Sequence, residues 1–311
     1  MSVLSSLLRP EVRGHERWPS QGPAAVRPLR FGQDFLENPD AFYSERLNQA
    51  MAFALEAHRS QKRKGRQTPY MAHLLTVAAY VLTFAPIQKG HSVIETDTLL
   101  KSTGHRVDIT LEDAYIAALL HDAIEDQGGA EMKARIRQRF DQAAFGPVVS
   151  ELVDYCTTHD PPDGAPPIDY NAKKRAQLIR VAYEAPQTAT LIAACDKLAN
   201  IRDTVQEYAE EGDRFWEKFK VSRAQKLRYI DDIAEVFTAC GRVPQVANEI
   251  SQTVRRLKRL IRRNENPIVR LWRRWVILPL QKAYQQASQK MLHRLRGLRG
   301  APASAEPALG L

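Results

Sequence analysis

Apolar residues recur at helical spacing along most of the chain between about residues 34 and 245. In LNQAMAFALEAHRS, the apolar residues Leu47, Met51, Ala54 and Leu55 recur at helical spacing, which is typical of one face of a helix. The same periodicity continues in PYMAHLLTVAAYVL, where Pro69 suits the first turn of a helix, and in LEDAYIAALLHDAIED, which ends at a Gly-Gly pair. This pattern predicts helices that each bury one side against a common core.

Further segments with helical periodicity are 131–158, KKRAQLIRVAYEA, TATLIAACDKLANIRDTVQEY and WEKFKVSRAQKLRYIDDIAEVFTAC. Strand patterns are almost absent, so we predict an all-α domain, a helical bundle, over residues 34–245. Residues 85–111 break the pattern with Pro86, Gly90 and Gly104, and we interpret them as a long connection or an insertion. Residues 1–33 contain several prolines among polar residues and are predicted to form an irregular lead-in.

The basic charge of the chain is concentrated near its C-terminus. The net charge is +9, but residues 251–299 alone carry 14 Lys and Arg and one acid, Glu265, so the rest of the chain is mildly acidic. Within this segment Leu257, Leu260 and Ile261 alternate with basic residues at helical spacing, and an aromatic run, LWRRWVILPL, follows. We predict a basic amphipathic helical extension over 246–299 and a disordered tail over 300–311.

The apolar run in the extension is too short to span a bilayer, and three interpretations of the extension stay open. It can lie on an anionic membrane surface, it can bind RNA through phosphates and stacking, or its apolar stripe can pack on the body or on a second subunit. The first would give peripheral association with a membrane, and the last a homo-oligomer. In each case we expect the segment to be dispensable for chemistry, because every candidate site residue lies before residue 203.

Cysteine usage and the N-terminus favour a cytoplasmic protein. Cys156, Cys195 and Cys240 lie far apart without CxxC spacing, so they offer neither a disulfide framework nor a zinc knuckle. The N-terminal residues lack a basic region followed by a long apolar stretch, so we expect no secretory signal.

Residues that bind metals or transfer protons interrupt three of the apolar helical segments. They are His73 in TPYMAH, the pair His121-Asp122 in LLHDAIED with the acids Glu125 and Asp126 after it, and Asp196 in ACDKLANIRD. Asp196 follows LIAAC, and burial of a carboxylate in such a setting is costly unless a cation or a hydrogen-bond donor meets it. The sequence therefore indicates a polar site inside the core.

The spacing of these residues supports a metal centre. His121 and Glu125 are four positions apart and share a helix face, and so do Asp196 and Asn200. A mixed set of imidazole and carboxylate ligands suits Mn²⁺ or a similar divalent metal better than a structural zinc. The alternative is that each histidine is an ordinary core residue and that Asp126, just before two glycines, is a solvated acid.

The stretches AHRSQKRKGRQTPYMAHLLTVA, ALLHDAIED and CDKLANIRD, in this order, resemble the HD-type hydrolase domain of RelA/SpoT proteins. Within that family the chain looks most like the stand-alone small alarmone hydrolases, such as the metazoan SpoT homologue. With the helices between them, these motifs cover about residues 38–240. The resemblance implies an HD-domain helical bundle and metal-dependent hydrolysis of the 3′-pyrophosphate of a guanosine alarmone, (p)ppGpp, to GDP or GTP and pyrophosphate.

The resemblance also implies roles for individual residues. The implied metal ligands are His73, His121, Asp122 and Asp196. The implied water-activating acids are Glu125 and Asp126, and the implied substrate-binding residues are Arg63, Lys64, Asn200 and Arg202. From the residues alone, Arg63 and Lys64 are equally consistent with a solvated basic turn. Two departures from the family pattern, Leu74 after the histidine and Cys195 before the last aspartate, leave the donor atoms unchanged.

Two other functions stay open at this point. One is an HD phosphohydrolase that acts on another nucleotide, such as pppApp or a nucleoside monophosphate. The other is a regulatory or nucleic-acid-binding protein with a non-catalytic HD fold, although the complete set of candidate ligands and acids argues against it. Too few residues follow position 245 for an alarmone synthetase domain, so we expect degradation of alarmone and not its synthesis.

Overall fold

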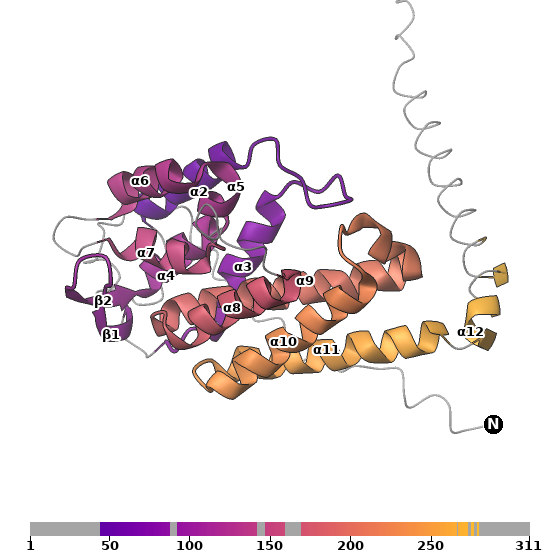
Figure 1. Ribbon diagram of the computed structural model, residues 1–311. Coiled ribbons are helices and arrows are strands. Elements are labelled where there is room, and N and C mark those ends of the chain that lie inside the picture. The colour runs from indigo at the N-terminus through magenta and orange to yellow at the C-terminus, as the bar shows by residue number, and fades with distance from the viewer. Residues whose placement is uncertain are drawn as a thin grey trace, which may run out of the picture.

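The computed structural model describes residues 44–87, 92–141, 147–158, 169–265, 267–272, 275–276 and 279. Helices dominate this part of the chain, which confirms the predicted all-α class (Figure 1). They are α2 (Glu45–Ala57), α3 (Met71–Phe84), α4 (Leu111–Leu120), α5 (Ala123–Gln127), α6 (Gly129–Phe140), α7 (Val148–Cys156), α8 (Tyr170–Tyr183), α9 (Gln187–Glu211), the 3₁₀ helix η1 (Gly212–Lys218), α10 (Arg223–Cys240), α11 (Pro244–Glu265) and α12 (Pro267–Trp272). The predicted lead-in, most of the extension after residue 272 and the predicted tail lie outside the described residues.

Helix α9 is the centre of the bundle. It is 25 residues long and contacts α3, α4, α7, α8, α10 and α11, and in Figure 1 it crosses the molecule between these helices. Leu191, Ile192, Ala194, Leu198 and Ile201 are among its buried residues and occupy several sides of the helix. A helix that is covered on several sides places the polar residues it carries inside the protein.

The segment predicted as a long connection contains a β-hairpin, which the sequence pattern did not reveal. Strands β1 (Val93–Leu99) and β2 (Arg106–Thr110) pair antiparallel, and the adjoining Leu100 and the β2 residue Ile109 are fully buried. The strands are rich in Val, Ile and Thr, which favour strands, but they are short and their register shifts twice. A short strand with an irregular register gives little alternation of apolar and polar residues, and therefore a weak signal.

The hairpin anchors the start of α9. The Glu95 carboxylate accepts hydrogen bonds from the backbone N–H of Gln187 (2.9 Å), the backbone N–H of Thr188 (2.7 Å) and the Thr188 hydroxyl (2.7 Å). These N–H groups belong to the first turn of α9, where a helix leaves its backbone donors unsatisfied and favours a negative charge. The contact lies about 13 Å along the helix from Asp196. The hairpin therefore fixes α9 at a point that is remote from the candidate site.

The segment predicted as one helix from Trp216 to Cys240 is divided. Helix α10 begins only at Arg223, because Ser222 and Gln225 form a capping box in which each side chain accepts a hydrogen bond from the backbone N–H of the other residue. The link between η1 and α10 carries Phe219, whose ring lies 5.0 Å from Lys64 Nζ. The division therefore brings this link against the basic loop at residues 61–70.

The first part of the predicted C-terminal extension belongs to the core. Val246, Ile250, Val254, Leu257 and Ile261 of α11 are buried, and the helix packs on α9 and α10. They are three or four positions apart, so α11 is amphipathic and its charged side faces away from the body. A cut after residue 245, the boundary that the sequence suggested, would expose this apolar side. Among the described helices, none combines the length and the apolar character that crossing a membrane requires.

Leu257→Ala tests the attachment of α11 to the body. Leu257 is fully buried, so the substitution leaves a cavity and should lower the free energy of unfolding by about 2–5 kcal/mol. Arg255, an exposed residue of the same helix, gives the control. Arg255→Ala should change the free energy of unfolding by less than about 0.5 kcal/mol. Chemical denaturation followed by circular dichroism measures both, and an equally small effect of the two substitutions would contradict the packing of α11 in the core.

Candidate metal centre

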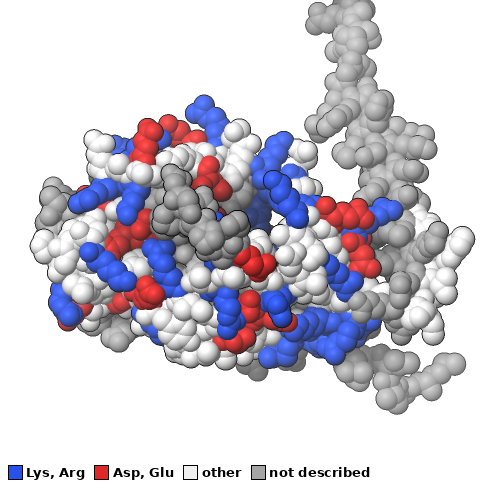
Figure 2. Space-filling model, in the orientation of Figure 1, with Lys and Arg blue, Asp and Glu red and all other residues white. Residues whose placement is uncertain are grey.

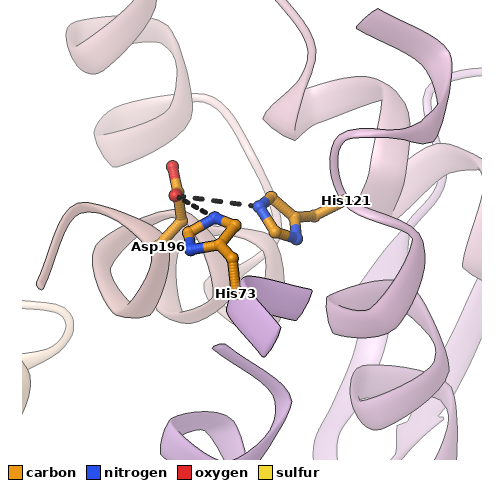
Figure 3. A group of neighbouring side chains, drawn as sticks. All are labelled: His73, His121 and Asp196. Carbon is orange, nitrogen blue, oxygen red and sulfur yellow. Dashed lines mark ion pairs between the residues drawn. The ribbon is translucent and has the colours of Figure 1, made fainter. Parts of the chain in front are cut away.

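Four side chains from three helical regions converge in the core. His73 lies near the start of α3, His121 and Asp122 lie at the junction of α4 and α5, and Asp196 lies in α9; Figure 3 shows the two histidines with Asp196. His73 Nε2 is 3.2 Å from Asp196 Oδ1 and 3.7 Å from Asp122 Oδ2, and His121 Nε2 is 3.0 Å from Asp122 Oδ2. Ligand atoms around one ion are about 3 Å apart when the metal–ligand bonds are roughly 2.0–2.2 Å, so this spacing suits a single metal.

The donor atoms of both histidines are available to a cation. His121 Nδ1 lies 2.8 Å from the carbonyl oxygen of Ala118, which can only accept, so Nδ1 carries the proton and Nε2 faces the carboxylates. His73 Nε2 and His121 Nε2 are buried and have no hydrogen-bond partner in the described part of the chain. Buried polar atoms are normally hydrogen-bonded, so these atoms fit the ligand set of a divalent metal ion.

Neighbouring positive charges keep the carboxylates of the cluster ionised. Burial alone would raise the pKa of both carboxyl groups, but His121 beside Asp122 and Lys197 beside Asp196 outweigh burial and hold each pKa well below its usual range. Burial would lower the pKa of His121, but the two carboxylates outweigh it and raise this pKa to about 10. Both aspartates are therefore ionised, and the imidazole holds a proton that a metal ion would displace on binding.

The HD pair lies where the predicted continuous helix from Leu111 is interrupted. Helix α4 ends at Leu120 and α5 starts at Ala123, so His121 and Asp122 occupy the junction. The backbone N–H of Asp126 donates to the carbonyl oxygen of Asp122 (2.9 Å), so the turn after the pair stays helical. The pair and the acid that follows it are therefore one helical turn apart.

The two candidate acids have different partners. The Asp126 carboxylate accepts a hydrogen bond from Gln61 Nε2 (2.7 Å), whereas the Glu125 carboxylate accepts one from the backbone N–H of Thr158 (2.9 Å) and lies 3.9 Å from Lys174 Nζ. Asp126 keeps access to solvent, but partial burial and, to a smaller extent, the neighbouring carboxylates raise its pKa. Access to water and a raised pKa both suit a group that takes a proton from water.

The basic loop is held in a tight fold. The backbone N–H of Arg63 donates to the carbonyl of Thr68, and that of Tyr70 donates to the carbonyl of Gln61, so residues 61–70 fold back on themselves. Gly65 has a φ of 74°, in the left-handed region that glycine adopts without steric cost. This fold projects Arg63 and Lys64 from a fixed backbone.

Arg63 joins the loop to α9 beside the cluster. Its Nη2 donates to Asn200 Oδ1 (2.9 Å) and to Asp203 Oδ2 (2.6 Å), and Asn200 Nδ2 donates to Asp196 Oδ1 (2.5 Å). Arg63 and His73 line the same pocket, which has a volume of about 210 Å³. The structure thus brings Arg63 and Asn200 to the cluster, while Lys64 lies against Phe219 at the neighbouring link.

Arg202 points away from the cluster and toward α11. Its Nη2 donates to Glu249 of α11 (2.7 Å), and its guanidinium lies 4.9 Å from the centroid of the Tyr80 ring. Along an α-helix Arg202 is about 120° around the axis from Asp196, whereas Asn200 is within about 40°. We therefore leave Arg202 out of the proposed substrate-binding residues; the helical period alone already separates it from the aspartate.

Several residues of the site were not found from the sequence. The Tyr70 hydroxyl donates to Asp122 Oδ2 (2.5 Å), and Gln61 holds Asp126. Both residues lie in the stretch AHRSQKRKGRQTPYMAHLLTVA, but a tyrosine or a glutamine in a sequence does not by itself indicate that it orients a carboxylate. Lys174 and Lys226 lie on helices after the HD pair, where the sequence offers only ordinary surface lysines.

Lysines that lack an acidic partner surround the Phe219 ring. Lys64 Nζ and Lys226 Nζ lie 5.0 and 4.6 Å from its centroid, and neither pairs with an acid in the part of the chain that the structure describes. Burial, together with the charges of Lys197, Lys174 and Lys64, lowers the pKa of Lys226 to about 8. Clustered positive charge of this kind is relieved by a bound anion, so this part of the site suits a polyanion.

Comparisons with known proteins identify the family of the chain. The HD domain family matches residues 50–223, more than half of the chain. GTP pyrophosphokinase rsh of Brucella melitensis is 32% identical over 162 residues, which cover 50% of this chain and 16% of rsh. MESH1 of Drosophila melanogaster, named as a guanosine-3′,5′-bis(diphosphate) 3′-pyrophosphohydrolase, is 28% identical over 161 residues, which cover 51% of this chain and 70% of MESH1.

A solved structure supports the same fold. It is that of a metazoan SpoT orthologue, described as hydrolysing ppGpp, and it matches with a TM-score of 0.50 at 22% identity, covering 71% of this chain and 99% of its own. The resemblance to RelA/SpoT-type HD domains that the motifs indicated is confirmed by these matches. The chain spans 16% of the length of rsh, so the likeness to rsh concerns one region of that protein.

Removal of one histidine tests the metal centre. His73→Ala should weaken the binding of Mn²⁺ by at least about 10–100-fold, because even residues that only orient metal ligands have effects of this size. His105→Ala removes an exposed histidine outside the cluster and should leave the affinity unchanged. Isothermal titration of chelator-treated protein measures both affinities. If the His73 variant binds Mn²⁺ as tightly as the parent protein, these four residues are not the metal centre.

Proposed function

Because the chain belongs to the HD domain family, we propose that it is a metal-dependent phosphohydrolase that removes the 3′-pyrophosphate of a guanosine alarmone, (p)ppGpp. The observation that carries the proposal is the convergence of two imidazoles and two carboxylates beside a loop arginine that reaches the same helix. A site of this composition suits phosphate chemistry, since it combines ligands for a cation with donors for an anion. MESH1, which is named for this reaction, is 28% identical to the chain over 161 residues.

We propose His73, His121, Asp122 and Asp196 as the ligands and Mn²⁺ as the metal. When bound, a divalent ion lowers the pKa of a coordinated water and offsets negative charge on the attacked phosphorus. Tyr70 orients the Asp122 carboxylate through its hydroxyl, and the Ala118 carbonyl orients the His121 ring. Mixed nitrogen and oxygen ligands favour Mn²⁺ over metals that prefer sulfur.

The chemical step is assigned to residues around this centre. The oxygen of a water molecule forms a bond to the phosphorus next to the ribose 3′-oxygen, and the bond from that phosphorus to the 3′-oxygen breaks. Asp126, held by Gln61, accepts the proton of the water, and the 3′-oxygen takes up a proton as it leaves as a hydroxyl group. The products are pyrophosphate and GDP or GTP, according to the number of 5′-phosphates on the substrate.

Basic side chains account for the choice of a polyphosphorylated nucleotide. Arg63 offers a guanidinium whose position is fixed by Asn200 and Asp203, and Lys64 and Lys226 offer ammonium groups that lack acidic partners among the described residues. Fixed donors of this kind bind phosphate oxygens without the cost of ordering flexible side chains. We propose that these residues bind the 5′-phosphates of the alarmone.

The substrate assignment is tested by incubation of the full chain with ppGpp, pppGpp, pppApp and GMP in the presence of Mn²⁺. Chromatography of the products should show GDP and GTP from the two guanosine alarmones, each with one equivalent of pyrophosphate, and no product after chelation of the metal. Faster cleavage of pppApp or GMP would assign the site to another nucleotide. An absence of turnover with every substrate, in protein that binds Mn²⁺, would favour the non-catalytic alternative.

Substitution of the acids separates catalysis from metal binding. Asp126→Asn should lower kcat by roughly 10²–10⁴-fold, because the variant lacks the base, while the affinity for Mn²⁺ stays close to that of the parent protein. Glu125→Gln should lower kcat as well, since its carboxylate is oriented by Thr158 next to the same site. Asp231→Asn, at a surface ion pair with Lys258, is the matched control and should keep full activity. Near-normal turnover in the Asp126 variant would exclude Asp126 as the base.

A further inference from the structure

The outer side of α11 forms a basic face. Six exposed side chains make up this face: Arg255, Arg256, Lys258, Arg259, Arg262 and Arg263. Figure 2 shows Lys and Arg gathered where Figure 1 draws α11. Lys258 pairs with Asp231, but Arg255, Arg256, Arg259 and Arg263 pair with no acid in the described ranges. The charge of this face is therefore largely uncompensated by the protein.

The acids nearest to this face are already neutralised. A groove of about 1120 Å³ between α9 and α11 is lined by several of these arginines together with Glu210 and Glu249. Glu249 pairs with Arg202 (2.7 Å), and Glu210 pairs with Arg66 (2.8 Å). The arginines of the basic face are therefore open to an anionic partner from outside the described body.

Large apolar side chains are exposed at the end of the basic face. In α12 and just after it, Leu271 is 59% exposed, Trp272 62% and Trp275 71%. The buried side of α11 is occupied by α9 and α10, so α11 offers no apolar surface to cover them. Clustered exposed aromatic and aliphatic side chains mark a surface that is covered by something else.

We propose that the α11–α12 surface, meaning the basic face of α11 together with Leu271, Trp272 and Trp275, docks on an anionic lipid bilayer. Its arginines contact the phosphate headgroups, and its apolar side chains enter the boundary between headgroups and acyl chains. Tryptophan favours this boundary, and basic residues near an anionic leaflet strengthen the binding. The protein lies on the membrane, since the apolar part of this surface comprises only one short helix and its immediate continuation.

Other partners fit these features less well. A nucleic acid would use the arginines and could stack bases on the two tryptophans, but it offers no apolar environment to Leu271. A second copy of the chain would bring two uncompensated basic faces together, which like-charge repulsion disfavours. An anionic bilayer satisfies both the charge and the apolar residues at once.

Vesicle binding by the full chain tests the proposal. The protein is mixed with vesicles of phosphatidylcholine alone or with added phosphatidylglycerol, at low and at high salt, and bound protein is separated by flotation. We expect binding to the anionic vesicles only, and weaker binding at high salt. Brominated phospholipids should quench the tryptophan fluorescence of the parent protein, and Trp272→Ala/Trp275→Ala should lose most of this quenching.

Charge variants separate a specific surface from overall basicity. Arg255→Gln/Arg259→Gln should lower the partition coefficient about 25-fold, because each basic residue near an anionic surface contributes roughly a factor of five. Arg137→Gln/Arg139→Gln removes the same charge from exposed positions of α6 and should have little effect. Circular dichroism checks that all variants fold. Equal effects of the two charge variants, binding to an RNA oligonucleotide without vesicle binding, or dimers that require Trp272 and bind no vesicles would each overturn the proposal.

Discussion

The buried carboxylate of Asp196 is the constraint on which the rest of the site depends. A negative charge inside a helical core is costly unless positive charge lies beside it. Lys197 Nζ lies 2.6 Å from one oxygen, and His73 Nε2 lies 3.2 Å from the other. Both rings of the cluster come from helices that are far from α9 in the chain, so the packing of α3 and α4 on α9 decides whether the charge is compensated. The cluster is therefore at once an electrostatic requirement of the fold and a set of metal ligands.

The position of α9 is fixed by contacts from segments outside the motifs. Glu95 of the hairpin caps its first turn, Arg63 of the basic loop holds its middle through Asn200, and α11 packs along its later turns. These contacts let a single long helix carry both a ligand and the anchor of the loop that is proposed to meet the phosphates. The hairpin and α11 thus contribute to the site by placing α9, although neither supplies a proposed ligand.

The same chain combines opposite electrostatic surfaces in separate regions. The cluster concentrates carboxylates around a cation, the Phe219 region gathers lysines, and α11 carries arginines on its outer side. Neutralisation of Glu249 and Glu210 by Arg202 and Arg66 keeps the basic face of α11 electrostatically distinct from the acidic residues of α9. Separation of this kind allows a basic surface to be recognised without disturbing the charge balance of the buried cluster.

The sequence by itself determined the helical class and the residues of the cluster, because helical periodicity is a local property and a ligand-type residue in an apolar pattern is conspicuous. It did not reveal the hairpin, whose strands are short and irregular in register. It left the packing of the apolar side of α11 on the body as one of three interpretations, and the structure shows this side buried. The helical period already placed Asn200 on the face of Asp196 and Arg202 off it. Only the tertiary structure decided that Arg202 pairs with Glu249, and that Gln61 and Lys226 belong to the site. The physical reason is that these assignments depend on which side chains from distant helices meet in space, and glutamine, lysine and arginine occur on so many surfaces that their type alone carries no such information.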